Sequence, residues 1–198
     1  MLGTPSSDRI AKRREATRRE ILDAAWAVAR EQGLGALTLR EVAVRVGMRP
    51  PSLYSHFESK DAIYDAMYGQ AWQIFHDQVK DRVLPKEPRA ALLEIAETFF
   101  DFAVADLARF QLMNQRSVPD FVPSKESYAM AVEVLDRLRR DLAAFGVTDE
   151  SDVDLFTALT GGFVDQQLAN DPGGTRWRRQ LPRLIDMYVK EVKPRRRR

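Results

Sequence analysis

The sequence predicts an all-α protein with two domains: an N-terminal three-helix domain with a helix-turn-helix, and a larger C-terminal helical domain. Along most of the 198 residues, apolar side chains recur at intervals of three and four, the period of a helix packed on one face. Gly, Pro and N-capping residues divide the chain into segments of helical length. The expected domains are residues 9–58 and 59–192, between a disordered stretch at 1–8 and a basic tail at 193–198.

Composition excludes several classes of protein. The chain has no cysteine, so disulfides, zinc fingers and thiol catalysis are excluded. It has no run of about eighteen apolar residues, and its first residues are polar and basic, unlike a signal peptide. We therefore expect a soluble, cytoplasmic protein with no membrane partner.

The net charge of +2 hides an uneven distribution. Residues 1–60 carry 11 Lys and Arg against 7 Asp and Glu, whereas residues 61–189 carry 14 against 21. Residues 190–198 carry 6 against 1. A basic head on an acidic body is typical of a protein that places one end on a polyanion. The alternative is a chance segregation of solvated charges.

The first helix is expected to end at Gly33. Its inward stripe includes Ile21, Leu22, Ala25 and Val28. Ahead of this stripe stands a group of basic residues: Arg9, Lys12, Arg13, Arg14, Arg18 and Arg19. Basic residues ahead of a helix-turn-helix either contact phosphates or reach into the minor groove, or they form a solvated charged arm.

Residues 37–60 have the pattern of a helix-turn-helix. Thr38 is of a type that caps helix N-termini. The apolar residues behind it recur at helical spacing: Leu39, Val42, Ala43 and Val46. Gly47 ends this helix, since glycine takes a left-handed backbone conformation without a Cβ penalty. Pro50 and Pro51 suit the first positions of a short second helix, with Leu53 turned inward.

The face turned away from the apolar residues carries a high density of hydrogen-bond donors. They are Arg40, Arg49, Ser52, Tyr54, Ser55, His56 and Lys60. An αα-hairpin with a glycine turn is common in helical proteins, and such a hairpin has no need of these donors. A helix-turn-helix on DNA does need them, because its second helix reads bases and nearby groups hold phosphates.

Residues 17–65 resemble the DNA-binding domain of the TetR family of bacterial transcriptional regulators. The matching features are the long first helix ending at Gly33, the entry Leu37-Thr38-Leu39-Arg40, Ala43, Gly47, and the run Ser52-Leu53-Tyr54-Ser55-His56-Phe57 followed by Ser59-Lys60. The pattern LYxHFxxK is highly specific for that family, and the resemblance covers roughly a quarter of the chain. The remainder fits the family in length and helical character.

The resemblance implies a homodimer that binds a palindromic double-stranded DNA operator, usually as a repressor, and that responds to a small molecule. Arg49, Ser52 and Ser55 are expected at base edges. Arg40 is expected at a base or a phosphate, and the rings of Pro50 and Pro51 on a thymine methyl. The residues expected on phosphates are Thr38, Tyr54, His56 and Lys60, of which the tyrosine and the lysine match residues that make such contacts in the family.

Ser59 is expected to cap a fourth helix, which in the family joins the two domains. The next predicted helix, residues 89–106, is apolar nearly all round, with one polar stripe of Glu94, Glu97 and Asp101. Three carboxylates on one face can hold a metal ion, but no histidine accompanies them. We therefore expect a solvated stripe, no metal site and no cofactor.

Three further helices are predicted. Residues 128–145 form an amphipathic helix, and Asp149 or Ser151 opens a helix at 153–169. Gly161 and Gly162 inside that helix indicate close approach of another helix, in this chain or in a second subunit. The last helix is expected at 175–192, and in the family the final two long helices form a four-helix bundle with their mates. The tail at 193–198 either adds non-specific DNA affinity or has no function.

The expected inducer is a small, largely apolar molecule bound among the fourth to eighth helices. Aromatic residues are expected to line its pocket, with one or both of two glutamines as orienting polar groups: Trp72, Phe99, Phe102, Phe110, Phe121, Tyr128, Phe163, Gln166 and Gln167. Each ring can instead be an ordinary part of the core. The hypothesis fails if no saturable apolar ligand is found and the domain has no cavity above roughly 300 Å³.

The sequence argues against an enzyme. His56 and His76 are the two histidines, too far apart for a metal pair on one helix, and there is no nucleophile elbow, P-loop or dinucleotide fingerprint. The alternative to a regulator is a helical ligand-binding or scaffold protein that does not use its helix-turn-helix on DNA. No motif names the inducer, the operator or the regulated genes, or separates a repressor from an activator.

Overall fold

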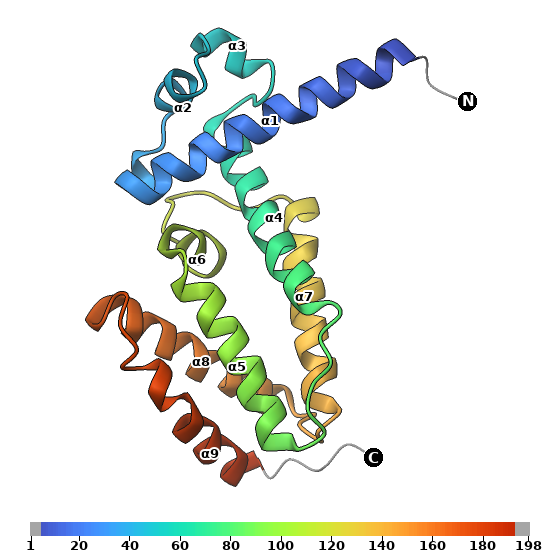
Figure 1. Ribbon diagram of the computed structural model, residues 1–198, viewed down its shortest axis with the longest axis vertical. Coiled ribbons are helices and arrows are strands. Elements are labelled where there is room, and N and C mark those ends of the chain that lie inside the picture. Colours follow the sequence, from blue (N-terminus) through green and yellow to red (C-terminus); the bar gives the residue numbers. More distant parts are fainter. Residues whose placement is uncertain (1–4, 193–198) are drawn as a thin grey trace. The chain divides into compact units, whose positions relative to one another are not determined.

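The computed structural model describes residues 5–192, which form nine α-helices and two short 3-10 helices, with no strand in that range (Figure 1). The helices are α1 Pro5–Gln32, α2 Leu39–Arg45, α3 Pro50–Tyr54, α4 Lys60–Val79, α5 Pro88–Val104, α6 Leu107–Asn114, α7 Lys125–Ala143, α8 Glu150–Asn170 and α9 Leu181–Val192. Within these residues, no helix has both the length and the hydropathy needed to span a bilayer. The expected tail at 193–198 lies outside the described residues, as do residues 1–4.

The described chain divides into two compact units. One unit runs up to Ala71 and includes Gln111–Tyr128; the other consists of Trp72–Phe110 and the chain from Ala129 onward. The boundary therefore falls inside α4 and not at residue 59, where the sequence pattern places it. Tyr64 and Gln70 in the first half of α4 are hydrogen-bonded to the end of α1 and the turn after it, whereas Phe75 in its second half packs on Phe99 and Phe102 of α5.

In the first unit, α1 is the longest helix, and α2 and α3 lie along one side of it (Figure 1). Ile21, Ala25 and Val28 are fully buried on α1, together with Trp26 at 5% exposure. α1 begins at Pro5, four residues before residue 9, where the sequence pattern places the start of the domain. Its acidic residue in the first turn, Asp8, is of the charge that favours a helix N-terminus.

Two hydrogen bonds join the first half of α4 to α1 and to the turn that follows it. The Tyr64 hydroxyl donates to the Leu34 carbonyl at 2.5 Å, and the Trp26 indole N–H donates to the Gln70 side chain at 2.7 Å. Tyr64 itself is fully buried. These contacts fix the part of α4 up to Gln70 to the three-helix domain.

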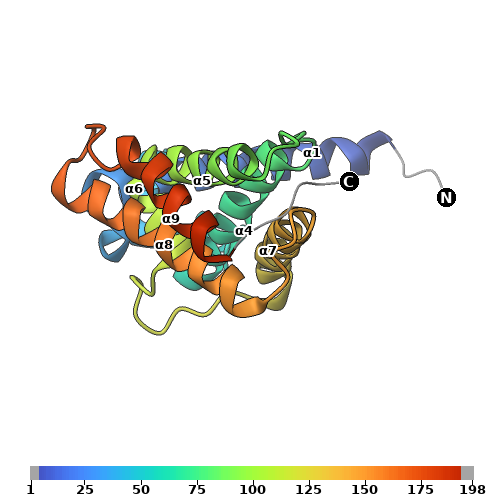
Figure 2. The ribbon, with the colours of Figure 1, turned by 90° about the horizontal axis from the view of Figure 1, so that it is seen from below.

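In the second unit, α5 packs against both α8 and α9, and these helices run side by side in both views (Figures 1 and 2). The core between them contains Leu92 and Phe100 of α5, Val164 of α8 and Leu181 of α9, all at or below 1% exposure. Because α5 packs against both α8 and α9, its sequence is apolar on nearly every side.

Two helical segments differ from the sequence prediction. Residues 107–114 form a separate helix, α6, because the Asp106 carboxylate accepts the backbone N–H of Arg109 at 3.1 Å and restarts the helix after α5. The last helix begins at Leu181, not at Thr175, because residues 171–180 are tied into turns and a 3-10 helix. The Asp171 carboxylate holds these turns by accepting the Arg176 N–H at 2.8 Å.

Candidate nucleic-acid interface

The first helix of the helix-turn-helix, α2, is capped at both ends as the sequence predicts. Thr38 precedes it in an extended conformation, and its hydroxyl accepts the Glu41 N–H at 3.1 Å. At the other end Gly47 has a φ of 66°, and the Met48 N–H donates to the Ala43 carbonyl at 2.8 Å. This arrangement is a Schellman motif, which needs a left-handed residue at the glycine position.

The second helix, α3, presents its first residues to solvent. Pro50 and Pro51 occupy its first two positions, where a missing N–H is harmless. Leu53 is fully buried and Phe57 is 2% exposed, so these two side chains hold α3 on the domain. The opposite side of α3 is therefore left free for a partner.

All ten residues that the sequence assigns to DNA belong to the first unit. Nine are exposed, namely Thr38, Arg40, Arg49, Pro50, Pro51, Ser52, Tyr54, Ser55 and Lys60, whereas His56 is half-buried. Tyr54 keeps 54% of its surface exposed, although it is a large aromatic residue. Of the residues in the pattern LYxHFxxK, Tyr54 and Lys60 are therefore accessible to a partner, whereas Leu53 and Phe57 belong to the core.

The cations on this surface differ in whether the protein neutralises them. Arg45 is paired with Glu31 at 2.5 Å and with Glu41 at 3.6 Å, and its hydrogen bond holds the pKa of Glu31 below the usual range. Arg40 and Arg49 have no carboxylate partner among the described residues. Their charge is therefore available for phosphates or bases, whereas that of Arg45 is not.

Several hydroxyl and ammonium groups already have internal contacts. The Ser55 hydroxyl donates to the Ser52 carbonyl at 2.7 Å, which leaves its oxygen as an acceptor. The Thr38 hydroxyl accepts from Glu41 and keeps its own hydrogen for donation. The ammonium of Lys60 lies 5.5 Å from the centre of the Tyr64 ring, within the range of a cation–π contact.

Arg14 and Arg18 of α1 hold the C-terminal end of α3. Arg18 donates to the His56 carbonyl and lies over the Phe57 ring, with its guanidinium 4.0 Å from the ring centre. Arg14 donates to the Ser55 carbonyl at 3.2 Å. These two arginines therefore hold the C-terminal end of α3 against α1. The sequence shows them as members of a basic group and does not distinguish this role.

A carboxylate on α4 binds the segment before α7. Asp65 accepts the Ser124 N–H at 2.6 Å, the Ser124 hydroxyl at 2.9 Å and the Ser127 hydroxyl at 2.8 Å. Phe121 of the same segment packs on Tyr64, with ring centres 5.6 Å apart. This cluster places residues 111–128 in the first unit. No sequence motif marks it, because its members are more than fifty residues apart.

The residues expected to bind the inducer do not form one pocket. Trp72, Phe99 and Phe102 are brought together around Phe75, whose ring centre lies 4.6 Å from that of Phe102 and 5.9 Å from that of Phe99. Trp72 and Phe99 are half-buried, and Phe102 is buried. Sequence spacing missed Phe75 as the centre of this cluster.

The other expected ligand residues lie elsewhere. Phe110 is 3% exposed inside the core of the second unit, Phe121 belongs to the first unit, and Tyr128 is 52% exposed. Gln167 is buried and holds the backbone, donating to the Asp171 carbonyl and accepting the Trp177 N–H at 3.0 Å. Phe121 and Tyr128 therefore belong to a different compact unit from Phe110, and the Gln167 amide is used in holding the backbone.

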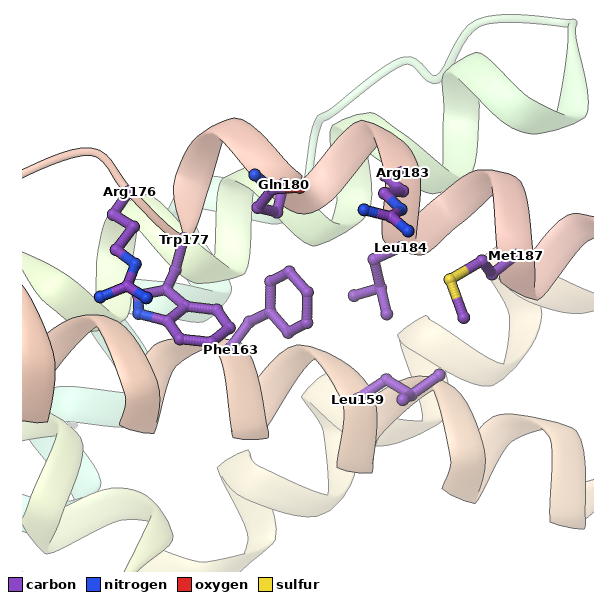
Figure 3. A pocket seen from close by; sticks show the side chains of 8 residues that line it. All are labelled: Leu159, Phe163, Arg176, Trp177, Gln180, Arg183, Leu184 and Met187. Carbon is purple, nitrogen blue, oxygen red and sulfur yellow. The ribbon is translucent and has the colours of Figure 1, made fainter.

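A groove of about 460 Å³ runs along α8 and α9 (Figure 3). Its walls are Leu159, Phe163, Arg176, Trp177, Gln180, Arg183, Leu184 and Met187. Phe163 and Trp177 meet edge to face at one end, with ring centres 5.6 Å apart. Of the nine residues expected to bind a ligand, the groove contains Phe163 alone. Gln166 is exposed and accepts from Asn170 at 2.9 Å.

The acidic stripe on α5 is engaged by an arginine. Arg178 donates to Asp101 from Nε at 2.7 Å and from Nη2 at 2.8 Å, and to Glu97 from Nη1 at 3.3 Å. Within the described residues, no group of three or more His, Cys, Asp and Glu is arranged to hold a metal ion. The carboxylates on α5 therefore tie the start of the α9 region to α5.

Known proteins with similar sequences are helix-turn-helix transcriptional regulators. A sequence model described as bacterial regulatory proteins of the tetR family matches residues 21–67. The chain is 31% identical over 88 residues to the uncharacterized HTH-type transcriptional regulator YobS of Bacillus subtilis, covering 44% of this chain and 46% of YobS. It thus spans about half the length of YobS, and 53% of a similar Haemophilus influenzae regulator.

Two further matches extend over most of the chain. The HTH-type transcriptional repressor Rv1474c of Mycobacterium tuberculosis is 26% identical over 196 residues, which cover 95% of this chain and 97% of the repressor. A crystal structure of a tetR-family regulatory protein from Rhodococcus RHA1 has a TM-score of 0.66 at 18% identity, over 88% of this chain and 96% of that one. The all-α fold is therefore shared over 88% of this chain.

Proposed function

We propose that this chain, which belongs to the TetR family of DNA-binding transcriptional regulators, represses transcription from a palindromic operator as a homodimer and leaves it when a small apolar ligand binds. The observation that carries the proposal is the row of exposed donors on α3 and beside it. Arg40 and Arg49 are cations without a carboxylate partner among the described residues, next to a helix held in place from behind. A surface of this kind is suited to DNA, which presents both charged phosphates and base edges.

We assign the residues of this surface two kinds of contact. Arg49, Ser52 and Ser55 would reach base edges in the major groove, with the rings of Pro50 and Pro51 against thymine methyl groups. The groups around them would hold phosphates and set the register: Thr38, Tyr54, His56 and Lys60, with Arg40 at a phosphate or a base. Exposure of nine of these ten residues supports the assignment.

The homodimer would form through α8 and α9. Their outer faces keep Leu155 at 40% and Met187 at 63% exposure, and the apolar groove with Phe163 opens between them. Gly162 is exposed in the middle of α8, and a Cβ added there meets nothing within 4 Å, so this face has room for a second helix. A dimer of this kind would present two α3 helices to half-sites about 34–36 Å apart or somewhat more.

The ligand would bind in the second unit against the rings around Phe75. Trp72 and Phe99 are half-buried members of that cluster, so each has surface left for an apolar molecule. A titration with an apolar dye such as Nile red, read by Trp72 fluorescence in a W26F/W177F background, tests this. We expect saturable quenching that Phe99→Ala weakens. Absence of saturable binding by the dye and by a panel of apolar compounds would remove the ligand from the proposal.

Selection of duplexes from random DNA tests the DNA-binding part. We expect a palindrome to be enriched, and Arg49→Ala to relax the base preference at one position of each half-site, with a loss of about 1–3 kcal/mol in discrimination. Lys60→Ala should instead weaken binding evenly across sequences and reduce the salt slope by about one per protomer. Failure to enrich any palindrome favours a helical ligand-binding or scaffold protein that does not use this surface on DNA.

A further inference from the structure

The N-terminal turns of α1 extend beyond the rest of the first unit. Every residue from 8 to 16 is exposed, Thr17 is the first half-buried residue, and Ile21 is the first buried one. In Figure 1 the helix continues past α3 in this direction. The family match begins at residue 21, so the extension lies outside it. No packing among the described residues accounts for these turns.

Charge distinguishes the extension from an ordinary solvated helix. Four of the residues from 8 to 16 are basic and two are acidic. Lys12 is paired with Asp8 at 3.1 Å. Arg9 and Arg13 have no carboxylate partner among the described residues and stand four positions apart, on the same face of the helix. Their Cα atoms are separated by about 6 Å along the helix axis.

The extension starts at the C-terminal end of the recognition helix. Arg14, directly after Arg13, donates to the Ser55 carbonyl at 3.2 Å. Arg18, one turn later, donates to the His56 carbonyl. Arg9 and Arg13 therefore stand on the turns of α1 just before the two arginines that contact the end of α3.

We propose that residues 8–16 form a helical arm that lies along the DNA backbone, with Arg9 and Arg13 each holding a phosphate outside the base pairs that α3 reads. This inference rests on the proposed function. The arm is a phosphate clamp and not a minor-groove arm, because an α-helix with side chains is about 10–12 Å wide and the minor groove is about 6 Å wide. Phosphate contacts carry no sequence information, so the arm adds affinity without changing the preferred operator.

The size of the effect follows from counterion release. Each phosphate contact contributes about 0.9 to the slope of log K against log salt concentration on B-DNA. Loss of two contacts lowers the slope by about 1.8 per bound protomer, and by about 3.6 for a dimer. Raising the salt concentration from about 50 to about 200 mM weakens DNA binding by both proteins. The factor by which the affinity falls should be about a hundred times smaller for a dimer without the arm contacts than for the unchanged protein.

The test compares three full-length proteins on the selected palindrome and on a scrambled duplex: the unchanged chain, R9A/R13A, and the control K86A/R140A. The control removes the same charge from two exposed residues of the second unit. Anisotropy titrations over a range of salt concentrations give the slope for each. We expect the reduced slope in R9A/R13A alone, with equal losses on both duplexes at low salt. Helix content by circular dichroism is the folding check, and R9Q/R13Q serves if alanine alters it.

Three outcomes contradict the arm. An unchanged salt slope in R9A/R13A overturns it, as does an equal reduction in K86A/R140A, which would show a general effect of net charge. A loss on the palindrome that the scrambled duplex does not share would place these arginines at bases instead of phosphates. If the unchanged protein binds no duplex with any preference, the proposed function itself fails, which is a separate result.

Discussion

Gly47 is the position where a single methyl group should most clearly separate backbone strain from packing. Its φ is 66°, and a Cβ added there meets nothing within 4 Å, so Gly47→Ala introduces strain and no steric contact. The left-handed conformation costs an L-residue roughly 1–2 kcal/mol. We therefore expect the free energy of unfolding of the first unit to fall by about that amount.

Gly35 provides the matched control. It lies in the same unit, its φ is outside the left-handed region, and a Cβ there also meets nothing within 4 Å. Gly35→Ala should therefore be neutral or stabilise by about 0.4–1 kcal/mol, because alanine has fewer unfolded conformations to lose. The two variants make the same chemical change and are expected to have opposite signs.

The assay is urea unfolding followed by Trp26 fluorescence in a W72F/W177F background, because Trp26 is the tryptophan of the first unit. With a slope of about 1–3 kcal/mol per M urea, a loss of about 1–2 kcal/mol lowers the midpoint by about 0.3–2 M. Equal midpoints for Gly47→Ala and the unchanged protein would refute the Schellman turn as the determinant of this helix end. So would a loss in Gly35→Ala as large as that in Gly47→Ala.

Three other substitutions test separate parts of the structure. Asp65→Ala removes the acceptor of three hydrogen bonds, and we expect the first unit to lose about 1–3 kcal/mol in the same urea assay, whereas no loss would mean that the cluster is replaced by water. Burial and the Asp152 carboxylate raise the pKa of Tyr188, so the folded protein keeps the phenol proton at a pH where the unfolded chain releases it. The contribution of this group to stability is therefore full below pH 10.0 and is lost as the pH rises above it. Tyr188→Phe should lessen that loss in denaturation experiments at about pH 9 to 11. Gly162→Ala should weaken the dimer by about 1–3 kcal/mol in sedimentation equilibrium through overpacking, and an unchanged dimer would place the interface elsewhere.

Local signals made the helix-turn-helix predictable from sequence. Thr38, Gly47 and the Pro50-Pro51 pair act through backbone chemistry within a few residues, so their effect is independent of the rest of the fold. The exposed donors followed because the apolar residues define the buried face and leave the other face open. The all-α class followed in the same way, from periodicity along each helix.

Contacts between distant residues were not predictable. Asp65 and Ser124 meet because α4 and the segment before α7 pack together, and neither residue is unusual in its local context. Arg18 appears in the sequence as one of several basic residues, although it caps α3 through the His56 carbonyl. Periodicity shows which face of a helix is buried, but not which partner covers it.

The scattered ligand candidates have the same physical cause. Phe121 and Phe102 look alike in sequence, since each is an aromatic residue in an apolar stretch, yet they belong to different compact units. Gln167 looks like a polar group in a pocket, but its amide is fully used at the end of α8. An aromatic residue that lines a pocket and one that fills a core have the same pattern, because both lie on the apolar face of a helix.

The most direct test is the affinity of the purified protein for duplex DNA from upstream of its own gene, measured by fluorescence anisotropy at about 50 and 200 mM salt against a scrambled competitor. Binding through about six to ten phosphates predicts affinity that survives the competitor and weakens by ~10³–10⁵ between the two salt concentrations. Equal affinity for the upstream duplex, the selected palindrome and the scrambled duplex at both concentrations would contradict a sequence-specific regulator.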